Sequence, residues 1–316
     1  MIRVLIIIGC VIGILTGGWF YLQLNAVQQF EKALIDIELD QHLSYQSISM
    51  NPITGVITLT KPVLKHQGGA SKWGNLPAFN LEAETLQTSF TQLQDITHLQ
   101  QGELAITGYK AKLIEDADLY RTIGDNQFVY MLVAMGYDKL PINFHVDWNY
   151  NQAEDLLTLN LKTSANQLGE INAKLSLDRL SLLETAAAQL NIVNLFSNQT
   201  DWESVRLTQL QATYLDQGFI RKFQQWFQLA QVKTPDSTII ELLSEPHYQQ
   251  LLTQLESQQV VKRNAQDWLD ALKSFIDNPA QLTISTNFSR PISFRALNSQ
   301  PSTGKVAELL ELDLDI

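Results

Sequence analysis

The sequence has few of the residues that nucleic-acid binding or disulfide cross-linking requires. Cys10 is the only cysteine among 316 residues, so no disulfide can form within the chain and the fold must rest on core burial. Charged residues make up 17%, and 33 acidic against 22 basic residues leave a net charge of −11. Because binding to a phosphate backbone depends on clustered Lys and Arg, we expect no nucleic-acid partner.

Motifs for metal, phosphate and nucleophile chemistry are also missing. The five histidines are scattered and show no H-x-x-x-H spacing, so no helix face presents two imidazoles to one metal ion. No G-x-G-x-x-G, G-x-x-x-x-G-K or G-x-S-x-G pattern occurs, which leaves no phosphate loop and no nucleophile elbow. We therefore expect no catalytic residue, no metal, no cofactor and a function that is not enzymatic.

Two pairs of polar residues keep an acid–base interpretation open. His145 and Asp147 are two residues apart in an alternating segment, and Glu154 follows Asp147 beyond a polar turn. Either pair has the residue types of a general acid and base. Alternation on the solvated face of a strand explains both pairs equally well.

A long uncharged run at the N-terminus predicts a membrane anchor. Residues 4–24 carry no charge, and about 20 apolar residues in a helix cross a hydrocarbon core of roughly 30 Å. Three aromatic residues cluster at 19–21, near the end of the run, where aromatic rings favour the headgroup region. A cleaved signal peptide is the alternative, but Leu24 stands where cleavage after Ala26 needs a small residue.

The charges on either side of this run predict its orientation. Arg3 precedes the run, whereas residues 25–40 carry Lys32 among four acidic residues. The excess of positive charge belongs on the cytoplasmic side. We therefore expect a single-pass protein of the bacterial inner membrane, with a cytoplasmic N-terminus and the bulk of the chain in the periplasm.

The middle of the chain has the period of two that is typical of β-strands. In residues 141–150 apolar side chains alternate with polar ones, and the same alternation returns in residues 157–161 and 171–177. These three segments predict an antiparallel meander with one solvated face. A hairpin is expected around Thr54-Gly55, and a final pair of strands is expected on either side of Arg290-Pro291.

Segments with a helical period separate the strands. We expect a helix over 126–135, capped by Asp125, and another that runs to Ile276 from a capping box formed by Asn264 and Asp267. Because helices and strands are segregated, we predict an α+β fold in which an N-terminal transmembrane helix precedes curved antiparallel β-sheet packed with amphipathic helices. The expected regions are an anchor at 1–27, a strand-rich region at 28–200 and an α+β region at 201–316, with the last two either separate or continuous.

The segment from Tyr214 to Trp226 is the densest cluster of charges and rings. Asp216 can accept a hydrogen bond from the backbone N–H of Gly218 or Phe219 and so cap a helix. That helix places its aromatic residues on one stripe, with Lys222 on the opposite, solvated face. The alternative is that Asp216 and Arg221 form a pair that recognises a ligand or partner.

The early strands carry a resemblance to known envelope proteins. The segments "GVITLTKPVL", "NLEAETLQTSF" and "GELAITGYKAKL" follow the apolar run, and this layout resembles the AsmA-like and YdgA-like inner-membrane-anchored proteins of bacteria. The resemblance covers about residues 1–115 and implies curved antiparallel sheet and a link to envelope or lipid homeostasis.

Two functions follow as hypotheses. In the first, the chain binds lipid or another apolar ligand in a groove between sheet and helices. In the second, it is a non-enzymatic interaction or scaffold protein of the envelope that uses its polar sheet face and binds no small molecule. The expected partners are the membrane, through the N-terminal helix, and either an apolar ligand or an envelope protein.

Overall fold

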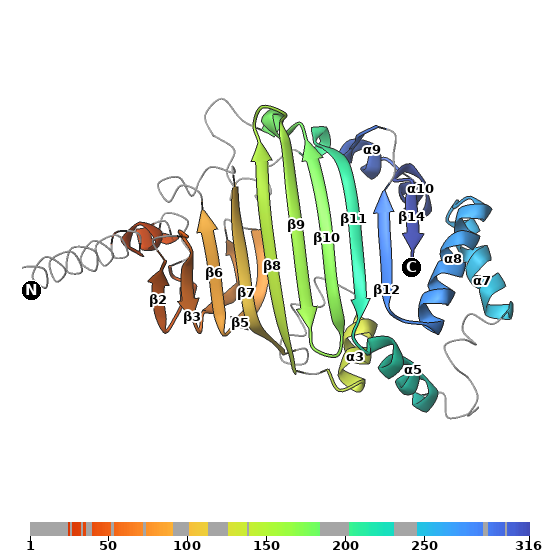
Figure 1. Cartoon of the computed structure of the whole chain (residues 1–316), viewed down its shortest axis with the longest axis horizontal. Helices are drawn as coiled ribbons and strands as arrows, with labels where there is room; N and C mark the ends of the chain where they lie inside the picture. The colour runs from red at the N-terminus through yellow and green to blue at the C-terminus, as the bar shows by residue number, and fades with distance from the viewer. Residues whose placement is uncertain are drawn as a thin grey trace, which may run out of the picture.

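A large antiparallel β-sheet forms the body of the protein in the computed structural model (Figure 1). The structure describes residues 25, 27–32, 34–35, 40–51, 54–71, 74–90, 101–112, 126–137, 139–183, 202–230, 245–286, 290–300 and 302–316. In the large sheet the spatial order of the strands is β14-β12-β11-β10-β9-β8-β7-β6-β3-β2, and β13 pairs with β11 as an eleventh strand. A second sheet has three strands in the order β1-β4-β5.

The strand bounds show that the longest strands lie at the centre of the large sheet. The large sheet contains β2 (Ser47–Met50), β3 (Ile57–Thr60), β6 (Thr85–Phe90), β7 (Gln101–Lys112), β8 (Lys139–Asn151), β9 (Leu156–Ala165), β10 (Gly169–Asp178), β11 (Arg206–Asp216), β12 (Gln281–Thr286), β13 (Ile292–Ser293) and β14 (Leu312–Asp315). The small sheet contains β1 (Leu43–Ser44), β4 (Val63–Ser71) and β5 (Gly74–Glu82).

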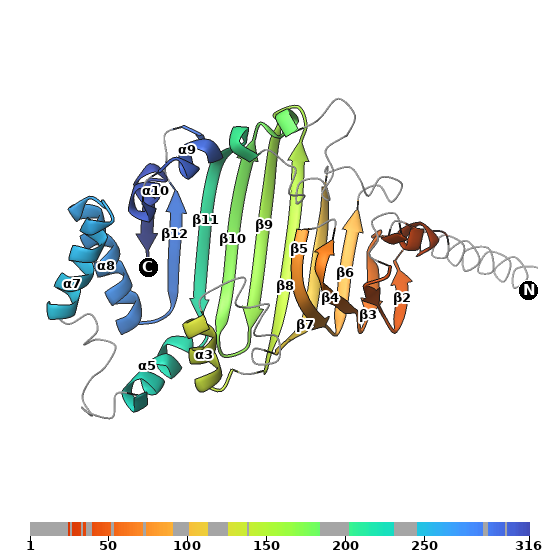
Figure 2. The ribbon, with the colours of Figure 1, turned by 180° about the vertical axis from the view of Figure 1, so that it is seen from behind.

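Helices lie at the ends of the strands and, in the case of α7 and α8, beside the edge of the sheet formed by β12 and β14 (Figure 1). They are α3 (Asn126–Ala134), α5 (Phe219–Ala230), α7 (Glu245–Ser257), α8 (Lys262–Asp277), α9 (Phe294–Asn298) and α10 (Thr303–Leu309), with 3₁₀ turns η2 (Leu180–Leu183) and η3 (Trp202–Ser204). Figures 1 and 2 show α3 and α5 at one end of the central strands and α9 and α10 toward the other. Helices α3, α5, α9 and α10 therefore cover the two ends of the central strands.

The apolar face of the sheet is buried in separate cores. Trp148, Leu157 and Leu177 pack with residues of η2, β13 and α10 at one end of the strands. Leu140 and Ala165 pack under α3 and α5 at the other end. A third core joins β2 and β3 to the helical residues around Phe30 and Leu34, and a fourth lies between α7 and α8.

The predicted meander is confirmed in the structure. Strands β8, β9 and β10 pair antiparallel and in sequence order, with Val146 opposite Leu161 and Leu161 opposite Ala173. The hairpin expected around Thr54-Gly55 is also present, because β2 pairs antiparallel with β3. The expected division at residue 200 falls between β10 and β11, which are neighbours in one sheet.

The predicted α+β fold class is wrong. Strands make up 46% and helices 32% of the structure's described part, and the C-terminal region, which we expected to be an α+β region, adds β11, β12, β13 and β14 to the same large sheet. Strands that pair with segments far away in the chain carry no local mark of their partner, so the sequence does not show that the strands of the C-terminal region extend the sheet of the preceding region. The final strand pair is also wrong, since β13 pairs with β11 and not with β12.

The expectation of a transmembrane helix, and with it the inner-membrane localisation, is corrected as well. Among the described residues no helix is long and apolar enough to cross a membrane. The longest of these helices, α8, has 16 residues and one polar face, whereas a span needs about 20 mostly apolar residues. The expected anchor at 4–24 lies outside the described residues.

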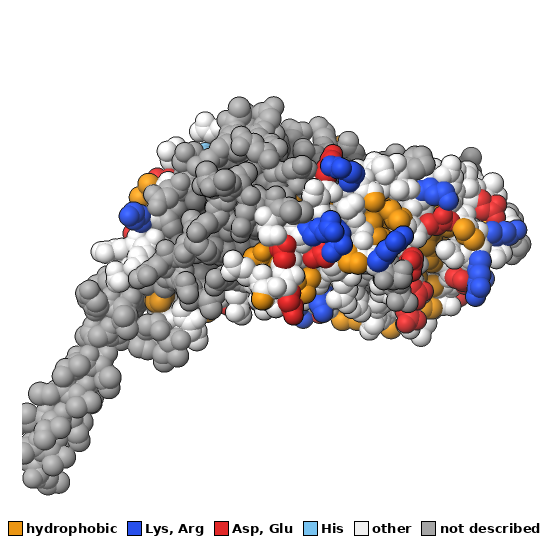
Figure 3. Space-filling view, turned by 90° about the horizontal axis from the view of Figure 1, so that it is seen from above, with side chains coloured by type: hydrophobic (Ala, Val, Ile, Leu, Met, Phe, Trp, Pro, Cys, Tyr) orange, Lys and Arg blue, Asp and Glu red, His pale blue; other side chains and the backbone are white. Residues whose placement is uncertain are grey.

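Charges of both signs are mixed on the surface. Figure 3 shows the protein from above, with acidic and basic side chains interspersed over the described part of that face. Hydrophobic side chains appear between them. No large patch of a single sign is visible on the described part of this face.

Candidate functional site

An apolar strip crosses the centre of the sheet between the two end cores. We define the apolar strip as six residues of β8 to β12 on the face that carries those cores: Phe144, Leu161, Ile171, Ala173, Ala212 and Ile284. The register places Leu161, Ala173, Ala212 and Ile284 opposite one another across four strands. Neighbouring strands are about 4.8 Å apart, so the strip from β8 to β12 is roughly 19 Å long.

The apolar strip is less covered than the cores on either side of it. Ile171 is 43% exposed and Ile284 is 36% exposed, and none of the six residues belongs to a core formed by the described residues. Leu157 and Leu177, further along the same strands, are 2% and 3% exposed. Leu161, Ala173, Ala212 and Ile284 are aligned across four strands, and the strip residues other than Ile171 and Ile284 are partly buried. Neighbouring apolar side chains that are partly accessible to solvent are typical of a binding surface.

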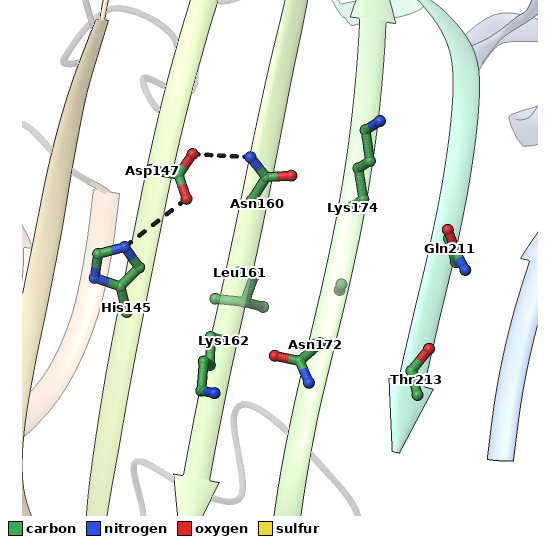
Figure 4. A pocket seen from close by; sticks show the side chains of 10 residues that line it. His145, Asp147, Asn160, Leu161, Lys162, Asn172, Lys174, Gln211 and Thr213 are labelled. Atoms are coloured by element: carbon green, nitrogen blue, oxygen red, sulfur yellow. Dashed lines mark hydrogen bonds and ion pairs between the residues drawn. The ribbon is translucent and has the colours of Figure 1, made fainter. Parts of the chain in front are cut away.

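The opposite face of the same strands is polar and contains a hollow of about 380 Å³. No helix of the described chain is drawn over β8 to β11 on the face seen in Figure 1. The hollow is lined by residues of four strands (Figure 4): His145 and Asp147 on β8, Asn160, Leu161 and Lys162 on β9, Asn172, Ala173 and Lys174 on β10, and Gln211 and Thr213 on β11. Leu161 and Ala173 alternate with the polar residues, so their side chains point to the opposite face. A second hollow, of about 540 Å³, shares Asp147 and Asn160 and extends toward Glu103 on β7.

Hydrogen bonds hold several of these polar side chains in place. Asn160 Nδ2 donates to Asp147 Oδ1 at 2.8 Å, and His145 Nε2 lies 3.8 Å from Asp147 Oδ2 (Figure 4). Lys162 Nζ lies 2.8 Å from Glu170 Oε1. This bond, with a second one from Asn172, lowers the pKa of Glu170. Carboxylates in and beside the hollow are therefore already engaged by neighbouring side chains.

The structure brings together one of the two candidate acid–base pairs. His145 and Asp147 are neighbours on the polar face, and their side chains are 41% and 43% exposed. No hydrogen bond or ion pair joins Asp147 to Glu154 among the described residues. Nucleophilic catalysis needs a hydroxyl, thiol or amine within hydrogen-bond reach of the base, and His145 has no such contact with a described residue.

Asp216 caps helix α5, as the sequence predicts. Its carboxylate accepts hydrogen bonds from the backbone N–H of Gly218 at 2.8 Å and of Ile220 at 3.0 Å. The hydroxyl of Tyr214 lies 2.9 Å from the same carboxylate. Burial of the phenol and this contact with Asp216 raise the pKa of Tyr214 well above its ordinary value. The Tyr214 hydroxyl also lies 2.5 Å from the backbone carbonyl oxygen of Leu168, so both of its acceptors belong to the protein.

The rings of α5 form the stripe that the sequence predicts. Phe219 stacks on Phe223 with ring centroids 6.0 Å apart, and Phe223 stacks on Trp226 at 5.9 Å. The position of Lys222 differs from the prediction, because its Nζ lies 4.0 Å from the centre of the Tyr137 ring. Lys222 thus makes a cation–π contact and is not simply solvated.

The pairing of Asp216 with Arg221 stays a prediction. Arg221 is exposed, and within the described part of the chain no hydrogen bond or ion pair joins it to Asp216. All the contacts given above for Asp216 lie within the cap and β11. Its observed geometry is that of a helix cap.

We expect Asp216→Ala to lower the free energy of unfolding by about 1–2 kcal/mol, because the first turn of α5 loses its cap. Arg221→Ala is the matched control and should stay within about 0.5 kcal/mol, since its side chain is exposed. Urea denaturation followed by circular dichroism measures both. Equal stability of the two variants would contradict the capping role.

Comparison with known proteins identifies a family. A family model described as "Uncharacterized protein" matches residues 152–315, just over half of the chain. The chain belongs to this family. The match includes β9 to β14 and so covers most of the apolar strip and of the polar hollow. No curated protein matches the chain.

Sequence reasoning missed the grouping of Lys174, Asn160 and Gln211 in one hollow. Each stands at a polar position of an alternating strand, which by itself predicts only a solvated face. The register that places Lys174 opposite Asn160 on one side and Gln211 on the other comes from pairing with β9 and β11. The predicted meander supplies the first of these neighbours, but the sequence around Tyr214, although typical of a strand, does not show that β11 pairs with β10.

Proposed function

We propose that this protein is a non-enzymatic binding protein for a lipid or another apolar ligand. The observation that carries the proposal is the apolar strip, which stays accessible between two buried cores on one face of the sheet. The resemblance to AsmA-like and YdgA-like proteins also implies a link to lipid homeostasis, and it agrees with this proposal.

The dimensions and residues of the apolar strip suit an extended acyl chain. Its length of roughly 19 Å, from the strand spacing, is comparable to a long acyl chain. Ala173 and Ala212 are opposite each other at its centre, and their small side chains make the strip shallower there than at the larger Leu161 and Ile284. Covering apolar surface contributes about 25 cal/mol per Å², so contact with an acyl chain along the strip would favour binding.

Ala173→Trp is expected to weaken binding of cis-parinaric acid, a fluorescent fatty acid, at least tenfold. The indole would occupy the centre of the apolar strip and displace the ligand. Ser285→Trp is the matched control, because Ser285 is on β12 and its side chain points to the polar face. Fluorescence titration of the lipid-free 316-residue chain measures both affinities.

Three outcomes of this titration decide the proposal. A selective loss in Ala173→Trp supports the apolar strip as the binding site. Equal binding by the parent chain and both variants would show that the fatty acid binds elsewhere. Absence of binding by the parent chain would refute the proposed function.

The second candidate function is that of an interaction protein without a small-molecule ligand. The uncovered polar face of β8 to β11 favours it, since hydroxyls, amides and both signs of charge are displayed there. Native mass spectrometry separates the two candidates. Lipid that co-purifies with the chain favours the first, and a mass equal to that of the bare chain favours the second.

A further inference from the structure

The hollow on the polar face contains a cation that the described part of the protein does not neutralise. Lys174 is exposed and makes no hydrogen bond or ion pair with another described residue. Directly across from it lie Asn160 on β9 and Gln211 on β11. The residues two positions away on its own strand are Asn172 and Ser176. None of these four neighbours carries a negative charge.

The diagonal neighbours of Lys174 do not supply a carboxylate either. The register places Lys162 and Thr158 on one side and Thr213 and Gln209 on the other. Lys162 is itself a cation, and its Nζ is already 2.8 Å from Glu170. Lys162 is thus paired with an acidic residue, whereas Lys174 has no acidic neighbour on the adjacent strands of this face. The absence of such a neighbour is notable in a chain whose net charge is −11.

The groups around Lys174 are suited to hydrogen bonding with a polar ligand. Gln211 and Thr213 present amide and hydroxyl groups, and Asn160 and Asn172 each retain a side-chain carbonyl oxygen beyond the bonds that their Nδ2 atoms make. No aromatic ring other than the imidazole of His145 lines the hollow within the described residues. Its volume of about 380 Å³ falls within the range typical of small-molecule sites.

We propose that this hollow binds a small hydroxylated molecule that carries one anionic group, a phosphate or a carboxylate. The anionic group would bind Lys174 Nζ in a charge-assisted hydrogen bond. The hydroxyl groups would bind the surrounding amides and Thr213. The polar side chains of this site point to the face opposite the side chains of the apolar strip, so the site is separate from the proposed lipid site.

The test is isothermal titration calorimetry at low ionic strength with the 316-residue chain and three probes. The probes are glucose 6-phosphate, gluconate and the neutral sugar glucose. We expect at least one of the two anions to bind at least tenfold more tightly than glucose. Glucose 6-phosphate and gluconate distinguish a phosphate from a carboxylate as the recognised group. Added salt should weaken binding of the anion, because part of the attraction is electrostatic.

Lys174→Met is expected to weaken binding of the anion at least tenfold, since hydrogen bonds to charged groups are the stronger ones. Lys139→Met is the matched control, because Lys139 is an exposed lysine of β8 that does not line the hollow. Thermal unfolding of both variants checks that the fold is kept. Binding of cis-parinaric acid should be the same in Lys174→Met and the parent chain.

Three results would contradict the proposal that the hollow binds an anionic ligand. Equal weakening by Lys174→Met and Lys139→Met would show non-specific attraction and overturn the proposal. Binding of the anions that is unchanged in Lys174→Met would do the same. If none of the probes binds the parent chain at millimolar concentration, the hollow is not a site for this class of ligand, whatever the outcome with the fatty acid.

Discussion

Leu157→Ala is expected to lower the free energy of unfolding by about 2–5 kcal/mol, the range for removing a buried leucine side chain. Leu157 is 2% exposed and packs in the core with Trp148, Leu177, Leu180 and Leu207. These neighbours come from four different elements, so the cavity left by the substitution cannot close by movement of one side chain. Equilibrium denaturation in urea measures the loss.

Leu156→Ala is the matched control for this prediction. Leu156 precedes Leu157 on β9 but points to the opposite face, and it is only partly buried. Its truncation should cost less than half as much. Equal losses for the two leucines would contradict the assignment of the buried face.

Gly102→Ala is expected to destabilise the protein by about 1–3 kcal/mol, as overpacking of a core typically does. Gly102 pairs with Trp148 across β7 and β8, and the indole lies over the glycine. A Cβ at position 102 would be 2.8 Å from Cε2 and 2.9 Å from Cη2 of that ring. Because Trp148 is 5% exposed, its ring has little space to move away.

A double-mutant cycle tests this cause directly. In a Trp148→Leu background the indole is absent, so Gly102→Ala should cost much less than it does in the parent chain. Thermal and urea unfolding of the four proteins give the coupling energy between the two positions. Additive effects would show that the glycine is needed for its backbone and not for the close approach of the ring.

Helix boundaries were predicted well where local chemistry decides them. The helix expected over 126–135 is α3 at Asn126–Ala134, and Asp216 caps α5. The capping box proposed for α8 is wrong, since the helix begins at Lys262 and its N-cap residue, Val261, makes no side-chain hydrogen bond. The backbone N–H of Val261 instead donates a hydrogen bond to the carboxylate of Glu308 in α10. Local sequence patterns cannot predict this contact, because the two residues are far apart in the chain.

The last predicted strand failed for a similar reason. Ile292 and Ser293 form the short β13, but Phe294 begins helix α9. Ser293 Oγ accepts a hydrogen bond from the backbone N–H of Ala296, so this serine is a helix cap where alternation alone predicted a continuing strand. A run of two alternating residues is too short to distinguish the two structures.

The sequence by itself determined which side chains of each central strand share a face, because the alternation of β8, β9 and β10 follows from the backbone geometry of a single strand. It also determined the cap at Asp216, which involves residues only a few positions apart. Tertiary structure alone decided that β11 would extend the sheet and place Gln211 beside Lys174. It also decided that the helices would cover the two ends of the apolar face and leave the apolar strip accessible. The pairing of strands and the covering of the apolar face by helices depend on contacts between segments far apart in the chain. Such contacts leave no periodic pattern in either segment.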